Sequence, residues 1–389
     1  MKVAVLGDGV TGKSVKAAIP KIPDCELVAP EQAELIISSP GIPPSQTDQY
    51  SAPVISDIEF AYRVFQTHPT ITPPKLIAIT GTNGKTTTTE MVAAALNCPV
   101  AGNIGVPLID YYGQDIPWIA LELSSYQLYR CQEFRAEISI ITQLSSDHLD
   151  WHGSLDNYHA AKFNLWQALR PSDHIIYDAA DPIVSDYAKS VAAIQHPIHD
   201  ADIKTEMQKH PRFFGRHQYI NLAMAKTAAA QSDVSSSDDW PEHFELAEHR
   251  MERFDVAGRL CVNDSKSTNW HATEAALAAA SDYPSTLMLG VEDKMIPIPD
   301  TFRDLPTHVR RVIAFGESRG RVIEALEQNA IPVLEAETLE AACRLAVDET
   351  APDEWILFSP ANPSFDEFKN YQERGRVFKQ TMLRLLEEA

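Results

Sequence analysis

The stretch from Leu76 to Met91 reads LIAITGTNGKTTTTEM, and its residue types suit a loop that binds phosphate. An apolar run leads into a turn that contains Gly81 and Gly84, and Lys85 then opens a predicted helix. Glycines leave backbone N–H groups facing phosphate oxygens, the lysine adds positive charge, and the hydroxyl of Thr86 can bind Mg²⁺. The residues predicted to bind ATP are Gly81, Thr82, Asn83, Gly84, Lys85, Thr86 and Thr87.

This loop is a variant of the general phosphate-binding pattern. The general pattern has a glycine five residues before its second glycine, and this chain has Ile79 at that position. A plain glycine turn with a threonine cap on the next helix would look similar. Because the strand, the Gly-Lys-Thr sequence and the helix all agree, the pattern favours ATP binding.

Further polar residues follow other apolar runs. Glu122 ends the run WIALE, and Lys162 lies on a predicted helix after a turn-rich segment. That segment contains Asp147, His148, Asp150 and His152. A carboxylate and a histidine near a phosphate loop suit metal coordination, although a single Glu or His is more often a hydrogen-bonded structural residue.

Two polar segments in the last third of the chain also follow apolar runs. VNDSKSTN contains Asn263, Asp264, Lys266, Thr268 and Asn269. SPANPSFDEFKNYQERG places Ser364 and Tyr371 where they could contact a ligand. The alternatives are a polar turn, a serine that caps a helix and an aromatic residue of the core.

The N-terminus has its own glycine turn. Gly7, Gly9 and Gly12 follow a short strand pattern and form G-x-G-x-x-G, a turn that lets a pyrophosphate approach a helix. No acidic ribose-binding residue is recognisable on a following strand. We therefore do not expect a nicotinamide site.

Alternating apolar runs and helical patterns predict an α/β protein of three domains. Residues 1–67 form a shortened Rossmann-like domain, residues 68–247 a central P-loop domain with a parallel sheet, and residues 248–389 a C-terminal Rossmann-like domain. The proline-containing segment Thr67–Lys75 reads as the first linker, and the polar segment Gln231–His243 reads as a loop near the second boundary.

Composition narrows the function classes. The net charge of −21 disfavours nucleic-acid and anionic-membrane binding. Five dispersed cysteines predict no disulfide framework and no structural zinc. The chain begins with a strand pattern instead of a signal peptide, and no apolar run is long enough for a membrane helix, so we expect a cytoplasmic protein. We also expect a monomer.

Taken together, the motifs resemble the Mur ligase family of peptidoglycan synthesis. They occur in the family's order over nearly the whole chain: TGTNGKTT, GNIG, LELSSYQL, SSDHLDWHGS with YHAAK, GRHQYIN, HRME, NDSKSTN and SPANPSFDEFKNYQERG. Within the family, ELSSYQL and SFDEFKNYQERG are most similar to the members that add D-glutamate. The resemblance implies that ATP phosphorylates the carboxylate of UDP-N-acetylmuramoyl-L-alanine, and that the amino group of D-glutamate attacks the acyl phosphate. Closure of the C-terminal domain on the central one is also implied.

The resemblance also implies roles for individual residues. Two Mg²⁺ ions would be held by Thr86, Glu122, His148 and Lys162, with Lys162 carbamylated and Lys85, Glu122, His148 and Lys162 catalytic. Further ATP contacts would come from His217, Asn221, Arg250, Asp264 and Lys266. The UDP-linked substrate would meet Val10, Thr11, Ser39, Gly41, Asn103, Ser124 and Gln127. D-glutamate would meet His249, Thr268, Lys294, Ser364 and Tyr371.

The chain departs from the family at three places. No second strand and no uracil-contacting Asp are recognisable between Pro20 and Ala33, which predicts weaker or rebuilt UDP recognition. Gln218 replaces an Asn of the family near the adenine, and Asn362-Pro363 replaces other small residues. Two other readings remain: a ligase of this fold with another acceptor, similar to folylpolyglutamate synthases, or a non-catalytic ATP-binding partner.

Overall fold

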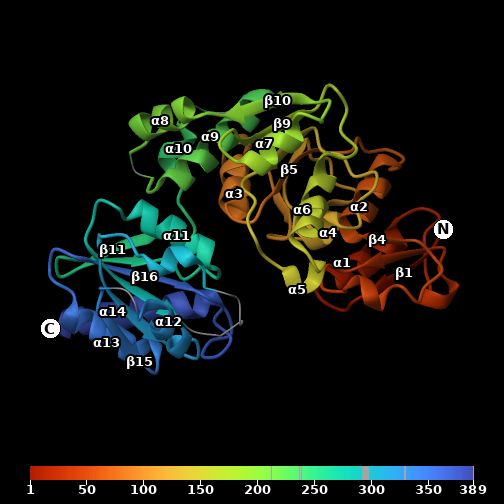
Figure 1. The fold of residues 1–389 in the computed structure, drawn as a ribbon. Helices are drawn as coiled ribbons and strands as arrows, with labels where there is room; N and C mark the ends of the chain where they lie inside the picture. Colours follow the sequence, from red (N-terminus) through yellow and green to blue (C-terminus); the bar gives the residue numbers. More distant parts are fainter. Residues whose placement is uncertain (212, 236, 238, 291–297, 328–329, 389) are drawn as a thin grey trace. The chain divides into compact units, whose positions relative to one another are not determined.

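The computed structural model describes residues 1–211, 213–235, 237, 239–290, 298–327 and 330–388. The chain forms two compact units (Figure 1). Unit one consists of Met1–Pro211 with Gln218–Phe244, and unit two of Arg212–His217 with Glu245–Ala389. None of the described helices is long and apolar enough to cross a membrane.

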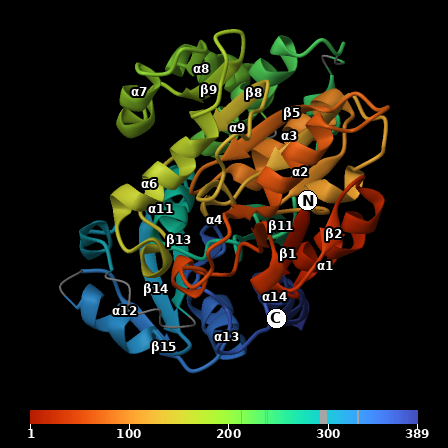
Figure 2. The same cartoon turned by 90° about the vertical axis from the view of Figure 1, so that its right-hand side faces the viewer.

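The first sheet of unit one has four parallel strands in the order β2-β1-β3-β4. Their bounds are β1 Lys2–Leu6, β2 Glu26–Leu27, β3 Leu35–Ser38 and β4 Val54–Ser56. Helices α1 (Val10–Ala18) and α2 (Asp57–Gln66) accompany the sheet, and Figure 2 shows α1 beside β1 and β2. Strand β2 lies between Pro20 and Ala33, where no strand is recognisable in the sequence. It has only two residues, both exposed, and so carries no apolar pattern.

The second sheet of unit one has six parallel strands in the order β10-β9-β8-β5-β7-β6. Their bounds are β5 Lys75–Thr80, β6 Val100–Gly102, β7 Trp118–Glu122, β8 Ile138–Ile141, β9 His174–Asp178 and β10 Ile194–Ile198. All residues of β7 and β8 are buried, which explains why these strands read as continuous apolar runs.

Helices lie between the strands of this second sheet and after its last strand, β10. Their bounds are α3 Lys85–Leu96, α4 Ser125–Leu128, α5 Leu149–His152, α6 Leu155–Phe163, α7 Pro182–Ala188, α8 Asp200–Lys209, α9 Arg216–Gln231 and α10 Trp240–His243. Helix α10 lies in the polar segment that the sequence presents as a loop. The parallel arrangement places the carboxyl ends of β5, β7 and β8 at one edge, where the predicted phosphate loop begins.

The two sheets of unit one share one hydrophobic core. Val3 and Ile37 of the first sheet and Leu121 of the second belong to the same buried cluster. Glu59 of α2 is fully buried and accepts hydrogen bonds from the backbone N–H groups of Gln132, Glu133 and Phe134. Residues 1–67 are therefore tied firmly to the segment around residue 130, and the domain boundary at 67/68 stays a prediction.

Unit two contains a six-stranded sheet in the order β11-β12-β16-β13-β14-β15. Strands β11 (Glu252–Val256) and β12 (Arg259–Asn263) are antiparallel, and the other neighbours are parallel. The remaining bounds are β13 Ser285–Gly290, β14 Val309–Phe315, β15 Val333–Ala336, β16 Trp355–Ala361, α11 Trp270–Ala279, α12 Arg319–Leu326, α13 Leu339–Glu349 and α14 Tyr371–Glu388. The segments NDSKSTN and SPANPS begin at the carboxyl ends of β12 and β16, which are adjacent.

Candidate active site

The predicted phosphate loop lies between β5 and α3, as the sequence indicates. Gly84 adopts a left-handed conformation with φ of 83°, and a Cβ there would lie 2.7 Å from Oδ1 of Asn221. Gly81 has φ of 149°, and its Cβ would lie 2.0 Å from the hydroxyl of Thr142. Both positions therefore require glycine for conformational and steric reasons. The loop therefore follows a path that a side chain at either position would block, as in a glycine-containing phosphate loop.

Two threonine side chains hold the phosphate loop in place through hydrogen bonds. The hydroxyl of Thr142 donates to the carbonyl of Asn83 at 2.5 Å. The hydroxyl of Thr82 accepts from the backbone N–H of Ser145 at 3.0 Å, which ties the loop to the segment after β8. Thr142 was not predicted from the sequence. The feature that could have identified Thr142 is its position directly after β8, the strand that pairs with β5.

We expect replacement of Gly81 by Ala to destabilise the protein by about 2–5 kcal/mol. This range is the sum of about 1–2 kcal/mol of backbone strain and about 1–3 kcal/mol of overpacking. Gly113→Ala is the matched control, since Gly113 also has positive φ (84°) but its Cβ would come no closer than 3.9 Å to other atoms. Urea unfolding of both variants measures the difference, and equal losses would show that the steric contact with Thr142 is unimportant.

Lys85 folds back onto the loop. Its Nζ donates to the carbonyls of Gly81 at 2.9 Å and Thr82 at 2.8 Å. The side chain is only half-buried. A positive charge is thus held directly at the loop that would receive phosphate oxygens.

Lys162 of α6 reaches the same loop and is 1% exposed. Its Nζ donates to the carbonyl of Gly81 at 2.7 Å and lies 4.8 Å from the ring centre of Tyr158. Burial, followed by the charge of Lys85, lowers the pKa of Lys162 well below its usual value, while Asp147 and Glu122 oppose the shift. The environment therefore favours the neutral amine of Lys162.

Glu122 lies at the carboxyl end of β7, paired with Ile79 of β5, and is 1% exposed. Its Oε1 accepts from Nδ2 of Asn103 at 2.7 Å. Its Oε2 is buried and has no hydrogen-bond partner within the described residues. A buried carboxylate oxygen without a partner is unfavourable, and a cation would relieve it.

No three side chains of His, Cys, Asp or Glu gather as a metal centre in the described parts of the chain. Magnesium nevertheless fits this site, because it is commonly held by one or two carboxylates together with substrate phosphates and water. The donors present are the unpartnered oxygen of Glu122 and the half-buried hydroxyl of Thr86 at the start of α3.

His148 precedes α5 in a left-handed conformation with φ of 52°. Its ring contacts the ring of Tyr126, with centroids 5.0 Å apart, and its Nε2 lies 3.6 Å from Oδ2 of Asp147. Tyr158 links this segment to the loop, since its ring lies near His148 and its hydroxyl is 3.1 Å from that of Thr82. Tyr158 was not singled out from the sequence.

The residues predicted to meet the UDP-linked substrate lie at the ends of strands in unit one. Asn103 is exposed and bonded to Glu122. Ser124 and Gln127 form a capping box at the start of α4, and Gln127 is buried and also bonded to Asp57. Val10, Thr11, Ser39 and Gly41 follow β1 and β3. Their substrate contacts stay predictions.

In unit two, Arg374 organises the polar segments. It is fully buried and donates to the carbonyls of Ser265 (2.6 Å), Asn362 (2.8 Å) and Pro363 (2.9 Å). It thereby joins NDSKSTN to SPANPS. Arg374 was not predicted from the sequence, although it lies in SPANPSFDEFKNYQERG. A buried arginine with three carbonyl partners is rare.

The other predicted residues of unit two lie around this junction. His249 is buried and bonded to Asn263. Lys266 lies over the ring of Tyr371, with its Nζ 4.4 Å from the centroid. Asp264 is buried and accepts from the hydroxyl of Ser359 at 2.8 Å, and burial raises its pKa to about 7.

The remaining predicted residues are less closely grouped. Ser364 is buried, and Arg250 and Thr268 are half-buried. Of the two predicted adenine contacts, Asn221 lies against the phosphate loop, whereas His217 belongs to the short segment of unit two before it. Lys294 lies outside the described residues.

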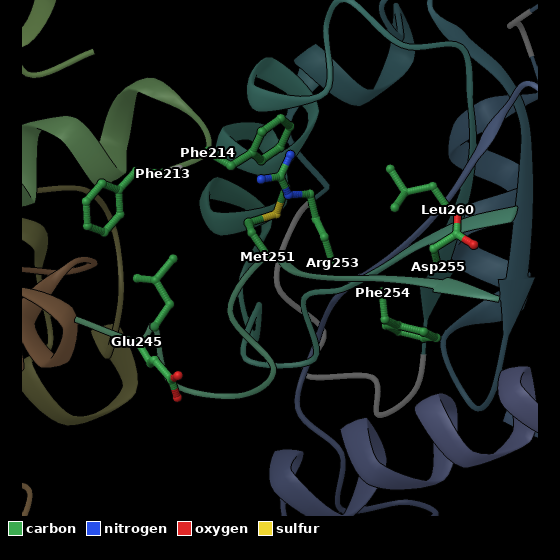
Figure 3. A pocket seen from close by; sticks show the side chains of 9 residues that line it. Phe213, Phe214, Glu245, Met251, Arg253, Phe254, Asp255 and Leu260 are labelled. Atoms are coloured by element: carbon green, nitrogen blue, oxygen red, sulfur yellow. The ribbon is translucent and has the colours of Figure 1, made fainter. Parts of the chain in front are cut away.

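A separate cavity of about 530 Å³ lies in unit two (Figure 3). It is lined by Phe213, Phe214, Glu245, Leu246, Met251, Arg253, Phe254, Asp255 and Leu260. The guanidinium of Arg253 lies 4.9 Å from the ring centre of Phe214. Figure 3 shows these two side chains beside each other. None of the predicted ligand-binding residues lines this cavity.

Known families and structures match this chain along most of its length. The family model described as the Mur ligase middle domain matches residues 79–215, and that described as the Mur ligase, glutamate ligase domain, matches residues 249–362. A solved MurF ligase from Thermotoga maritima in complex with ADP covers 99% of this chain and 95% of its own, with a TM-score of 0.67 and 13% identity. That similarity confirms the α/β fold of the Mur ligases.

Curated relatives are more similar in sequence. A UDP-N-acetylmuramoylalanine--D-glutamate ligase from Acidobacterium capsulatum is 32% identical over 92% of this chain and 84% of its own length. A protein of the same name from Cytophaga hutchinsonii is 33% identical over 91% of this chain and 86% of its own. With this level of identity over nearly the whole length, and with the phosphate loop and its two lysines in place, the chain belongs to the Mur ligase family.

Proposed function

We propose that this protein joins D-glutamate to UDP-N-acetylmuramoyl-L-alanine and converts ATP to ADP and phosphate. The observation that carries the proposal is the match to D-glutamate ligases over about nine-tenths of the chain. The site of unit one supports the ATP-dependent part, because Lys85 and Lys162 both contact Gly81 beside the buried Glu122.

The reaction begins with two anions that repel each other. The substrate carboxylate must form a bond to the γ-phosphorus of ATP while the bond to the β-phosphate oxygen breaks. Lys85 and the N–H groups of the glycine loop would hold the phosphates in line and stabilise the charge on the leaving ADP. Bound Mg²⁺, one ion on Thr86 and Glu122 and a second on His148 and a carbamylated Lys162, would supply further positive charge.

The amino group of D-glutamate then attacks the acyl carbon, an amide forms, and phosphate and a proton leave. His249, Thr268, Ser364 and Tyr371, with Lys294, are the residues proposed to hold the amino acid. Arg374 supports this assignment, because it fixes the segments that carry Thr268 and Ser364. Excluding water would prevent wasteful hydrolysis of the acyl phosphate.

Phosphate release tests this function directly. The protein is mixed with ATP, Mg²⁺, UDP-N-acetylmuramoyl-L-alanine and D-glutamate, and each component is omitted in turn. We expect phosphate only from the complete mixture. Comparable rates with L-glutamate would contradict the proposed stereochemistry, and turnover with another acceptor only would overturn the proposed substrate.

A further inference from the structure

Arg130 connects the segment after α4 to the first sheet of unit one. Its Nη1 donates to the hydroxyl of Ser38 at 2.6 Å and to the carbonyl of Ile42 at 3.4 Å. Its Nη2 donates to the hydroxyl of Thr47 at 2.8 Å. These acceptors enclose the turn that follows β3, which contains Ser39 and Gly41.

The charge of Arg130 is not balanced by a carboxylate. All three acceptors are neutral oxygens, and no ion pair joins Arg130 to any described residue. Burial lowers the pKa of Arg130, and the electrostatic effects of Tyr129 and Asp48 oppose this shift. Arg63 and Arg135, also partly buried in unit one, each pair with two carboxylates. A partly buried guanidinium without an acidic partner is unusual and suits an anionic ligand.

The surroundings of Arg130 also suit a nucleotide. The carboxyl ends of β1 and β3 lie side by side in the parallel sheet, where ligands of such sheets bind. The hydroxyl of Ser39 is buried there without a hydrogen-bond partner among the described residues, and it would lie 2.6 Å from a Cβ on Gly7. A guanidinium has five N–H donors, and the described contacts use three of them.

We propose that Arg130 binds the diphosphate of the UDP-linked substrate, supplying a positive charge from the central segment at the turn that follows β3. The proposal rests on the proposed function, which makes a nucleoside diphosphate the ligand of this sheet. In a chain of net charge −21, a local cation is needed to hold such an anion. Arg130 is also hydrogen-bonded to the turn that follows β3, so the turn and the guanidinium would both contact the ligand.

The test compares the variants Arg130→Met and Arg130→Lys with the control variant Lys189→Met. Lys189 is an exposed cation at the end of α7 that pairs with Asp186. Calorimetry with UDP and with uridine measures the contribution of the phosphates. We expect Arg130→Met to weaken UDP binding at least tenfold, Arg130→Lys to restore part of it, and uridine binding to stay unchanged. The Lys189→Met control should bind UDP like the parent protein.

A purely structural role predicts a different pattern. If Arg130 only ties the turn to α4, Arg130→Met lowers the melting temperature and weakens UDP and uridine equally, which overturns the proposal. Failure of the unaltered protein to bind millimolar UDP overturns it as well. Because the measurement needs no turnover, a protein that binds UDP through Arg130 but releases no phosphate would refute the proposed function and leave this inference standing.

Discussion

Replacing Lys162 by Met is expected to lower kcat by about 10²–10³-fold, the usual loss when one preorganised electrostatic group is removed from an active site. Lys162 is almost fully buried against Gly81, at the loop that would receive ATP. An ammonium ion there would repel the cations that the reaction needs. The expected loss therefore depends on what chemical form this side chain takes.

The neutral amine that burial favours can react with carbon dioxide. Its lone pair forms a bond to the carbon of CO₂, one C–O π bond becomes the carboxylate, and the nitrogen loses a proton. The product is an anion in place of a cation, beside the unpartnered oxygen of Glu122. We therefore expect the parent protein to incorporate isotopically labelled bicarbonate as a carbamate, detectable by NMR.

Two measurements separate this role from a structural one. Lys162→Met should show no carbamate signal and retain its melting temperature within a few degrees, whereas Lys189→Met should keep both the signal and the activity. If the parent protein carries no carbamate, or if Lys162→Met retains full kcat, the assignment of Lys162 as a modified catalytic residue is wrong.

Much of unit one could be predicted from its sequence because its signals are local. The runs that became β5 and β7 are buried over almost their whole length, and the glycine loop between β5 and α3 has local steric requirements. Strand β2 could not be predicted because its two exposed residues show no burial pattern. Its backbone pairing with β1 forms only when the sheet assembles.

The supporting residues of the site could not be predicted because their partners are distant in the chain. Thr142 donates a hydrogen bond to the carbonyl of Asn83, which lies 59 residues away in the sequence. Arg374 donates to the carbonyl of Ser265, which lies 109 residues away. Their residue types are common, so only the packing of neighbouring strands reveals them. The residues in motifs were found, whereas those that hold the motifs in place were mostly missed.

Lys85→Ala is expected to lower kcat by about 10²–10³-fold and to weaken ATP binding, because its ammonium group would stabilise the charge that develops on the leaving ADP. The matched control is Lys75→Ala, on the strand that leads into the same loop. Lys75 pairs with Asp233 at the surface, so its loss should cost about 0–1 kcal/mol of stability and leave kcat unchanged. Steady-state phosphate release and ATP calorimetry on both variants provide the comparison. If both variants lower kcat by the same small factor, Lys85 contributes only to the overall charge of the protein. The loop would then not stabilise the phosphate that is transferred.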